Sequence, residues 1–220
     1  DFDVNDISVS GGSIDSFTAV SATVYTAVFT PSEDSTASGL ISVTGDKFTD
    51  AAGNDNTAGS LTLAVDTTEP TISITTSDSE LKAGETAQIT FTLSEESTDF
   101  DVNDISVSGG VLTDFTGSGA SYTAIFTPST NSTSPGVITV SSGRFADAAG
   151  NANFAGSLTL AVDTVVPEIV ISTNDSELKA GETATIIFTL SEESTDFDVN
   201  DISVSGGSID SFTAVSATVY

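Results

Sequence analysis

The chain repeats itself with a period of about 97 residues, and this repeat limits the possible folds more than any other sequence feature. The stretch DFDVNDISVSGG occurs three times, beginning at Asp1, Asp99 and Asp196. A period of this length is longer than the roughly 20–50 residues of a solenoid repeat, and it suits one whole small domain. We therefore expect domains arranged in tandem.

Self-alignment indicates where one domain gives way to the next. Residues 1–66 align with 99–163, and residues 68–98 align with 165–195. We expect three domains: one that lacks its first two strands, one that is complete and one cut within its fifth strand, at 1–66, 67–164 and 165–220. The incomplete domains are complementary, so we expect copies of the chain to associate end to end through these split domains. Alternatively, the chain is one stretch of a longer array.

Within one period, every regular segment has the pattern of a β-strand. Val, Ile, Thr and Phe alternate with polar residues, and Gly, Pro, Asn and Asp separate the segments. The pattern predicts seven strands in the complete period, at 71–74, 86–93, 104–109, 111–116, 121–127, 136–141 and 157–162. The alternating apolar positions predict a core of Ile89, Phe91, Leu93, Ile105, Val107, Tyr122, Ala124, Phe126, Leu158, Leu160 and Val162. We therefore predict an all-β fold of tandem immunoglobulin-like β-sandwiches.

Composition excludes several classes of function. The chain has 32 Asp and Glu against 4 Lys and Arg, for a net charge of −28, so no basic patch is available for nucleic acid. It also contains 38% hydrophobic residues and 13 Phe, which argues against disorder. No apolar run approaches the roughly 20 residues of a membrane span. The absence of His and Cys excludes the usual nucleophilic triads and thiolate metal sites.

Acidic residues concentrate in loops that an immunoglobulin-like sandwich brings to one end. In this topology the loops after the second and sixth strands, 94–103 and 145–151, lie at the same pole as the preceding connector, 64–70. The loop after the first strand, 76–85, lies at the opposite pole beside the next connector, 161–167. Acid-bearing segments that are distant in the sequence are therefore expected to converge at each junction between domains.

Clustered carboxylates and Asn side chains, without His or Cys, predict a Ca²⁺ site, because Ca²⁺ takes several hard oxygen ligands. Mg²⁺ demands a tighter octahedral geometry and fits less well. The candidate ligands are Asp50, Asn54, Asp66, Glu69, Asp78, Glu80, Glu95, Glu96, Asp99, Asp101, Asn103, Asp104, Asp147, Asn151, Asp163, Asp175, Glu192, Glu193, Asp196 and Asp198. The alternative is that these are solvated loop and turn residues. Lys82 and Lys179 are expected to form ion pairs.

An active site is not expected. Paired carboxylates can serve a glycosidase, but Trp is absent and the acids recur in every repeat. Catalytic groups are seldom copied in successive domains, so we predict that the chain is not an enzyme.

Three motifs together resemble a known family. LKAGETA at 81–87, FTLSE at 91–95 and DAAGN at 147–151 resemble the bacterial Ig-like extender repeats of giant RTX adhesins, and the resemblance covers all 220 residues. These adhesins belong to Gram-negative bacteria and include biofilm and ice-binding types. The resemblance implies a secreted, surface-tethered chain of many such repeats, in which calcium ions stiffen the connectors. The connector acids Asp66 and Asp163 match the family's AVDT element.

The expected function is therefore mechanical. The repeats are predicted to be calcium-rigidified spacers that project a distal ligand-binding region from the bacterial cell surface. Two alternatives belong to other classes. The repeats themselves bind a glycan, a surface or ice, or they are linker modules of a secreted polysaccharide-degrading enzyme.

Overall fold

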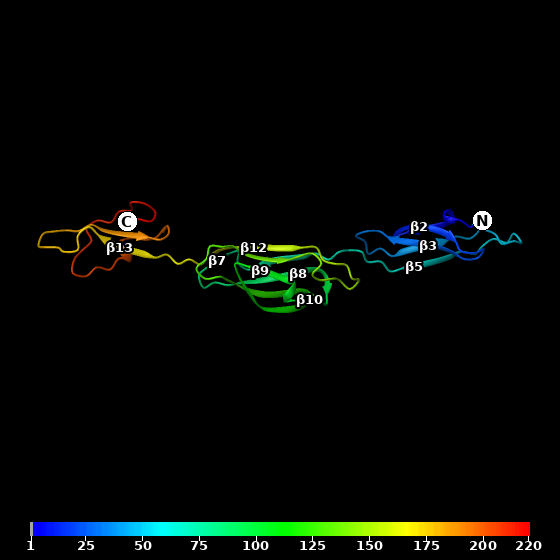
Figure 1. Ribbon diagram of the computed structural model, residues 1–220, viewed down its shortest axis with the longest axis horizontal. Coiled ribbons are helices and arrows are strands. Elements are labelled where there is room, and N and C mark those ends of the chain that lie inside the picture. The colour runs from blue at the N-terminus through cyan, green and yellow to red at the C-terminus, as the bar shows by residue number, and fades with distance from the viewer. Residues whose placement is uncertain (1) are drawn as a thin grey trace. The chain divides into compact units, whose positions relative to one another are not determined.

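The computed structural model describes residues 2–220. Asp1, which opens the first DFDVND copy and the first predicted domain, lies outside the described residues. The chain divides into two compact units, residues 1–163 and 164–220, and its strands follow one another as labelled in Figure 1. No helix among residues 2–220 is long and apolar enough to span a bilayer.

The complete repeat in the middle of the chain is a sandwich of two sheets (Figure 1). Its strands are β6 (Ile72–Thr76), β7 (Glu80–Lys82), β8 (Ala87–Ser97), β9 (Ile105–Ser108), β10 (Gly110–Pro128), β11 (Gly136–Val140) and β12 (Gly156–Asp163). One sheet has the strand order β10-β8-β6 and the other the order β7-β12-β11-β9. This confirms the predicted all-β, immunoglobulin-like sandwich.

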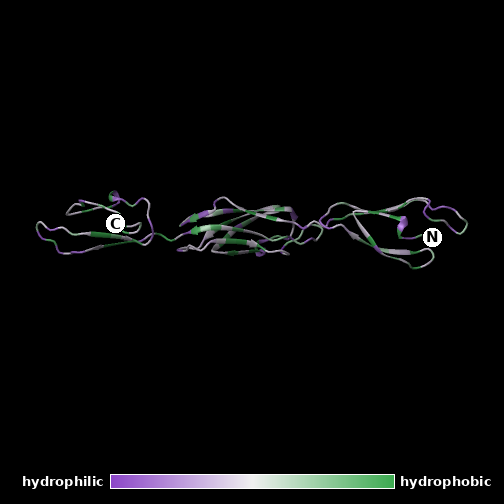
Figure 2. Ribbon diagram, turned by 90° about the horizontal axis from the view of Figure 1, so that it is seen from above, coloured by the Kyte–Doolittle hydropathy of each residue, from purple (hydrophilic) through white to green (hydrophobic). Residues whose placement is uncertain are grey.

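The core of this repeat lies between the two sheets, and Figure 2 shows hydrophobic residues along its strands. Eight of the predicted core residues are buried, namely Ile89, Phe91, Leu93, Tyr122, Ala124, Phe126, Leu160 and Val162. Ile105, Val107 and Leu158 are partly buried against them. Phe100 joins the core from the loop after β8, with its ring centroid 5.0 Å from Tyr122 and 5.1 Å from Phe145. All eleven predicted residues belong to the core or pack against it, but the prediction omitted two loop phenylalanines, Phe100 and Phe145, and six strand residues, namely Ile72, Ile74, Leu81, Ala87, Ile138 and Val140.

The structure has two strands, β6 and β7, where the sequence predicted one strand and a loop, and the two belong to different sheets. β6 pairs with β8, whereas β7, in a stretch predicted to be a loop, pairs in parallel with β12. Leu81 in β7 is 2% exposed and belongs to the core. A strand of three residues with charged residues on both sides of its one apolar residue has too little alternation to be recognised.

Two further boundaries were predicted wrongly. β8 continues four residues beyond 93, so Glu95 and Glu96 lie in a strand and not in a loop. The segments predicted as separate strands at 111–116 and 121–127 form one continuous element, β10, which folds back on itself. A Cβ atom on Gly110 would collide with the Thr127 carbonyl, and the Ser129 N–H donates to the Gly109 carbonyl at 2.9 Å, so the two arms lie side by side.

The first repeat contains the later strands of the same sandwich. They are β1 (Ile7–Ser10), β2 (Gly12–Ala19), β3 (Tyr25–Pro31), β4 (Gly39–Val43) and β5 (Gly59–Leu63), arranged as the sheets β1-β4-β5 and β2-β3. Phe2 lies 5.1 Å from Tyr25 and 5.2 Å from Phe48, which repeats the aromatic cluster of the middle domain. Phe48 is nevertheless 36% exposed, against 2% for the equivalent Phe145.

Residues 164–220 contain the earlier strands. β13 (Ile169–Thr173) and β14 (Ile186–Leu190) pair in antiparallel fashion, as β6 and β8 do. The following stretch contains the short helix η3 (Val199–Asp201) and one isolated bridge, from Thr189 to Val219. Ile171 is therefore 61% exposed, whereas the equivalent Ile74 in the complete repeat is 8% exposed.

Candidate metal centre

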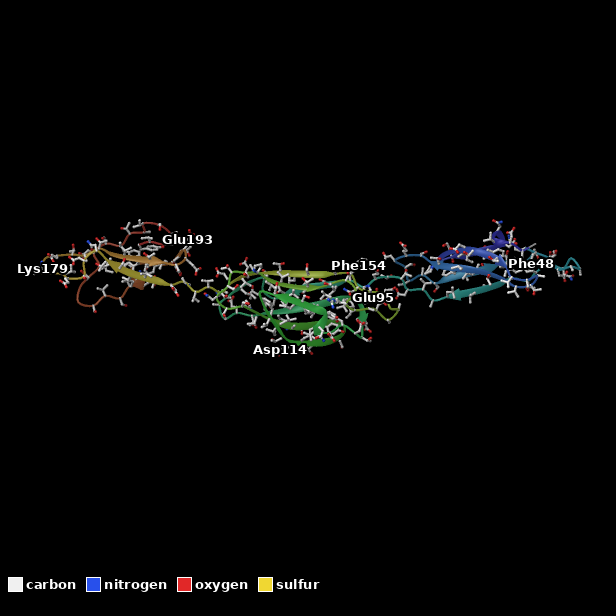
Figure 3. All side chains as sticks on the ribbon, in the orientation of Figure 1. Phe48, Glu95, Asp114, Phe154, Lys179 and Glu193 are labelled. Carbon is white, nitrogen blue, oxygen red and sulfur yellow. The ribbon has the colours of Figure 1, made fainter. Side chains whose placement is uncertain are left out.

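Three carboxylates meet at one end of the middle repeat. Asp66 comes from the connector, Glu95 from the end of β8 and Asp147 from the loop after β11. One oxygen of each lies within 4.8 Å of the others, and among residues 2–220 this is the one such group of three. Figure 3 shows Glu95 at this end of the domain. The connector, the end of β8 and the loop after β11 therefore converge at the pole that the topology predicts.

The DAAGN sequence forms a tight loop whose backbone N–H groups donate hydrogen bonds to the Asp147 side chain and so fix its position. Asp147 Oδ1 accepts the N–H groups of Ala149, Gly150 and Asn151 at 2.8, 2.7 and 2.9 Å. Its Oδ2 accepts the side-chain amide of Asn151 at 2.8 Å. Burial alone would raise the pKa of Asp147, but these hydrogen bonds to the ionised form outweigh it and lower the pKa. Asp147 is therefore held as a carboxylate.

Asn151 also joins this loop to the connector. Its Nδ2 donates to the Asp66 main-chain carbonyl at 3.2 Å as well as to Asp147. The Asp66 carboxylate in turn accepts the Thr68 N–H at 3.2 Å, which fixes the direction of the side chain. The connector acid thus reaches the group of three through contacts that the middle repeat itself supplies.

The next connector residue is bonded to the first repeat. The Thr67 N–H donates to the Ser35 carbonyl at 3.0 Å, and Thr67 Oγ1 donates to the Ser32 carbonyl at 2.7 Å. One peptide group, between Asp66 and Thr67, therefore accepts a hydrogen bond from the middle repeat at its carbonyl and donates one to the first repeat at its N–H.

Of the three carboxylates, Glu95 is the one whose ionised form is disfavoured by its surroundings. Burial raises its pKa first, and the negative charges of Asp66 and Asp147 raise it further. Among the described residues the one salt bridge joins Lys82 and Glu85, at 3.6 Å between Nζ and Oε1, so no basic side chain neutralises the three acids. This bridge confirms the ion pair expected for Lys82.

The donor atoms fit a hard cation such as Ca²⁺. All three side chains offer carboxylate oxygens, and Ca²⁺ accepts six to eight oxygen ligands in a flexible geometry. Asp147 Oδ1 already accepts three hydrogen bonds, so Oδ2 is the atom with capacity left for a metal. Because Glu95 has no positive partner here, a bound cation would remove the repulsion that raises its pKa.

The acids of the DFDVND stretch shape their own loop. Asp101 caps the short helix η2 (Val102–Asp104), with its Oδ1 accepting the Asn103 N–H at 2.6 Å. The Asp104 carboxylate accepts the Asp101 N–H at 2.8 Å and completes a capping box. The same box recurs in η1 (Val4–Asp6), capped by Asp3, and in η3, capped by Asp198. These side chains lie outside the group of three.

Asp99 links two loops of the middle repeat. Its Oδ1 accepts the hydroxyl of Ser97 at 2.6 Å and the N–H of Ala146, in the loop after β11, at 3.1 Å. The Ser97 hydrogen bond is the main reason that the pKa of Asp99 is lowered. In the third repeat, Asp196 accepts the equivalent hydrogen bond from Ser194 at 2.8 Å.

The remaining candidates also lie outside the group of three. Asp50 and Asn54 rebuild the DAAGN loop in the first repeat, with the Asn54 amide donating to Asp50 Oδ2 at 2.9 Å and lowering the pKa of Asp50. Asp78 and Asp175 each accept the N–H two residues later at 3.0 Å, as turn residues do. The exposed candidates are Glu69, Glu80, Glu96, Asn103, Asp163 and Glu193. Glu192 takes the position of Glu95 in the third repeat, and its Oε1 is buried without a hydrogen-bond partner.

Asn153 is a structural residue of this site that the sequence prediction missed. It is 2% exposed, and its Oδ1 accepts the N–H groups of Arg144 and Phe145 at 2.7 and 3.0 Å. Its Nδ2 donates to the carbonyls of Ser141 and Phe154 at 3.0 and 2.6 Å. The available signal was its recurrence as Asn56 in the first repeat, where the side chain bonds the equivalent loop.

Comparison with known proteins identifies a family for every part of the chain. A family model described as a bacterial Ig-like domain matches residues 1–65, 66–162 and 163–220. No curated protein and no solved structure matches the chain.

Proposed function

This chain belongs to the bacterial Ig-like domain family, and from that premise we propose that it is a calcium-rigidified extender of a large bacterial surface adhesin. Bacterial Ig-like domains are generally non-catalytic structural modules, and they often occur as repeats in surface proteins. The chain carries three neighbouring repeats in tandem. Beyond family membership, we propose that the repeats bind calcium and that the adhesin is of the RTX type. We also propose that the repeats lie outside the cell, where they project a distal ligand-binding region.

The observation that supports the calcium role is the position of the acids at the connector. Asp66 belongs to the segment that joins two repeats, while Glu95 and Asp147 belong to the body of the middle repeat. A cation shared by the three would therefore tie the connector to the repeat that follows it. The three carboxylates come from segments that are distant in the sequence, yet one oxygen of each lies within 4.8 Å of the others.

The expected strength of the effect follows from mass action. Extracellular calcium modules bind with a Kd of about 10⁻⁴–10⁻³ M. At a ten- to hundredfold excess of calcium, one site stabilises the folded state by roughly 1.4–2.7 kcal/mol. In this chain, that stabilisation would come from relieving the repulsion at Glu95 and from holding Asp66 against the loop after β11.

A matched pair of variants tests the proposal. Glu95→Gln removes one predicted ligand, whereas Glu96→Gln removes the same charge from the exposed neighbouring residue of β8. Calcium binding is measured by titration calorimetry, and the melting temperature is measured in EDTA and in millimolar Ca²⁺. We expect the parent chain and Glu96→Gln to gain stability with calcium, and Glu95→Gln to lose at least tenfold in affinity at this site.

The spacer role is tested by small-angle scattering of the same three proteins. Calcium should narrow the distribution of distances between repeats in the parent chain and in Glu96→Gln, but not in Glu95→Gln. If Glu95→Gln responds to calcium as the parent does, the three acids are a solvated surface. Specific retention of the chain on cells, glycans or ice would instead support a binding function.

A further inference from the structure

The loop between β10 and β11 of the middle repeat carries an N-x-S/T sequon, formed by Asn131, Ser132 and Thr133. This sequence is the acceptor for N-linked glycosylation when its middle residue is not proline, and it belongs in a surface loop of an exported protein. Asn131 and Thr133 are both exposed. Among residues 2–220, neither side chain takes part in a hydrogen bond, so the amide and the hydroxyl are both accessible to a transferase.

The first repeat shows that this loop does not need asparagine for its conformation. Asp34 takes the position of Asn131, and the two residues have φ angles of 47° and 54°. Both are exposed, and each is followed by Ser and Thr. A left-handed backbone suits Asp and Asn alike, so it does not select one over the other. A single residue therefore separates a complete sequon from an incomplete one in the same loop.

A second sequon, NDS at 174–176, has a structural use instead. Asn174 Oδ1 accepts the Thr185 N–H at 2.7 Å, and the Asn174 N–H donates to the Thr185 carbonyl at 3.3 Å. In the middle repeat Ser77 takes this position, and its Oγ accepts the Gln88 N–H at 3.0 Å. Asn174 therefore supplies a hydrogen bond that the hairpin requires, and its side chain would have to leave that bond to be modified. Of the two sequons, Asn131 has the side chain that the fold leaves unused.

We propose that Asn131 is the acceptor of an N-linked glycan. In the transfer, Asn131 Nδ2 attacks the anomeric carbon of a glycosyl phosphate, in which a nucleotide or a lipid carries the sugar. A bond forms between this nitrogen and the anomeric carbon, and the bond from that carbon to the phosphate oxygen breaks. The phosphate leaves with the electron pair, and one amide proton passes to a base of the transferase. The product carries a bulky, hydrated group on the loop.

Peptide mapping of the protein purified from the bacterium that produces it tests this assignment. Trypsin cleaves after Lys and Arg, so Lys82, Arg144 and Lys179 place the two sequons in separate peptides, 83–144 and 145–179. Mass spectrometry with fragmentation should locate a sugar on Asn131 and none on Asn174. A single hexose would indicate a nucleotide-linked donor, and a preassembled oligosaccharide would indicate a lipid-linked donor.

Four variants produced in the same cells separate the sequon from other causes. Asn131→Asp rebuilds the loop of the first repeat, and Thr133→Ala keeps the amide but removes the hydroxyl, so both should lose the sugar. Thr133→Ser retains a hydroxyl and should keep it. Asn174→Asp is the control and should leave the sugar on 83–144 unchanged. Each variant replaces an exposed side chain, and circular dichroism should show all four folded.

A peptide 83–144 without sugar would overturn the proposal, as would a sugar that lies on Ser or Thr or that persists in Asn131→Asp. The inference goes beyond the calcium proposal and is independent of it, because the sequon contains none of the three carboxylates. Calcium binding by the parent chain and by Glu95→Gln is measured separately.

Discussion

Several polar side chains in this chain act mainly by forming hydrogen bonds with backbone N–H and carbonyl groups of the loops. Asn153 is the clearest case, since its side chain makes four hydrogen bonds while 2% exposed. Asp147 does the same for the adjacent DAAGN loop. The loop that carries a candidate metal ligand is therefore built by its own side chains before any cation binds.

Replacing Asn153 should destabilise the middle repeat strongly. Asn153→Ala leaves two N–H groups and two carbonyls without their partner, and each buried unsatisfied group costs roughly 1–3 kcal/mol when water cannot replace the bond. We expect a loss of about 2–4 kcal/mol in the free energy of unfolding, measured by urea unfolding in EDTA. Asn103→Ala, at an exposed position, should change it by less than about 0.5 kcal/mol. Similar values for both variants would contradict the assigned role of Asn153.

The pKa of Asp99 predicts how stability changes with pH. Hydrogen bonds from Ser97 and Ala146 lower its pKa in the folded state, so ionised Asp99 favours folding. This contribution is present above the unfolded-state pKa of about 3.9 and is lost as the pH falls through the lower folded-state pKa. Asp99→Asn should therefore show a shallower loss of stability between about pH 5 and pH 2.

Asp114→Asn is the control for this titration, because Asp114 is exposed and its φ of 54° is one that Asn also adopts. An Asp99→Asn slope equal to that of Asp114→Asn would contradict the role assigned to Asp99. Glu95 acts with the opposite sign: its raised pKa means that folding favours the protonated form, so its contribution weakens as the pH rises. Urea unfolding at a series of pH values measures both slopes.

At the scale of elements, the hairpin of β10 in the middle repeat and the equivalent hairpin of β2 and β3 in the first repeat close with different turns. In the middle repeat, β10 turns back at Gly117 and Gly119, both with positive φ, of 140° and 65°. In the first repeat, the stretch that closes the hairpin between β2 and β3 is one residue longer and contains no glycine, and Ala19 at the end of β2 takes the position of Gly117. The shorter turn therefore depends on glycine, and the longer one does not.

Gly117→Ala should destabilise the middle repeat by about 1–3 kcal/mol. The added Cβ would collide with the Ser121 carbonyl and with Tyr122, and the backbone angle itself disfavours alanine. Thermal unfolding provides the measurement. Replacing residues 115–122 with the first-repeat sequence FTAVSATVY should be tolerated, because that sequence closes the same hairpin. A stable Gly117→Ala would show that the turn can adopt another conformation.

The sequence predicted the long, alternating elements well and the short or irregular ones poorly. Phe91 and Phe126 lie on faces whose period of two is visible in the sequence, so their burial followed from the pattern. Leu81 lies in a three-residue strand whose existence depends on parallel pairing with β12, a tertiary contact. The end of β8 at Ser97 depends likewise on pairing with Gly119.

The sequence predicted where the candidate site lies, but not which side chains form the group of three. Topology alone brings the connector and two loops to one pole, which is where Asp66, Glu95 and Asp147 meet. Twenty side chains were nevertheless predicted as ligands. The sequence does not reveal that Asp101 and Asp104 close a capping box, or that Asp99 bonds Ala146, because these roles depend on loop conformation.

At the scale of the whole molecule, charge repulsion acts throughout the chain. The net charge is −28, and the one salt bridge among residues 2–220 is the exposed contact between Lys82 and Glu85. Repulsion of this kind opposes the compact state and is screened over a Debye length of about 10 Å at 0.1 M salt. Monovalent salt should therefore stabilise the protein without occupying a site.

A comparison of NaCl with CaCl₂ distinguishes the screening of charge repulsion from the binding of calcium. Raising NaCl from about 0.01 to 0.15 M should increase the melting temperature gradually, as the Debye length falls from about 30 to 8 Å. CaCl₂ at matched ionic strength should add a further increase that saturates in the millimolar range. Superimposable curves for the two salts at equal ionic strength would indicate screening alone.

The peptide group between Asp66 and Thr67 has a mechanical consequence. A peptide group is planar and has no free rotation between its carbonyl and its N–H, and here these two ends are bonded to different repeats. A pulling force along the chain passes through the covalent backbone at this point, while the flanking hydrogen bonds resist only twisting and bending. Each of those bonds contributes about 0.5–1.5 kcal/mol, far less than the unfolding of a sandwich. A sideways load would therefore release the joint first, and the middle sandwich would remain folded when it re-forms.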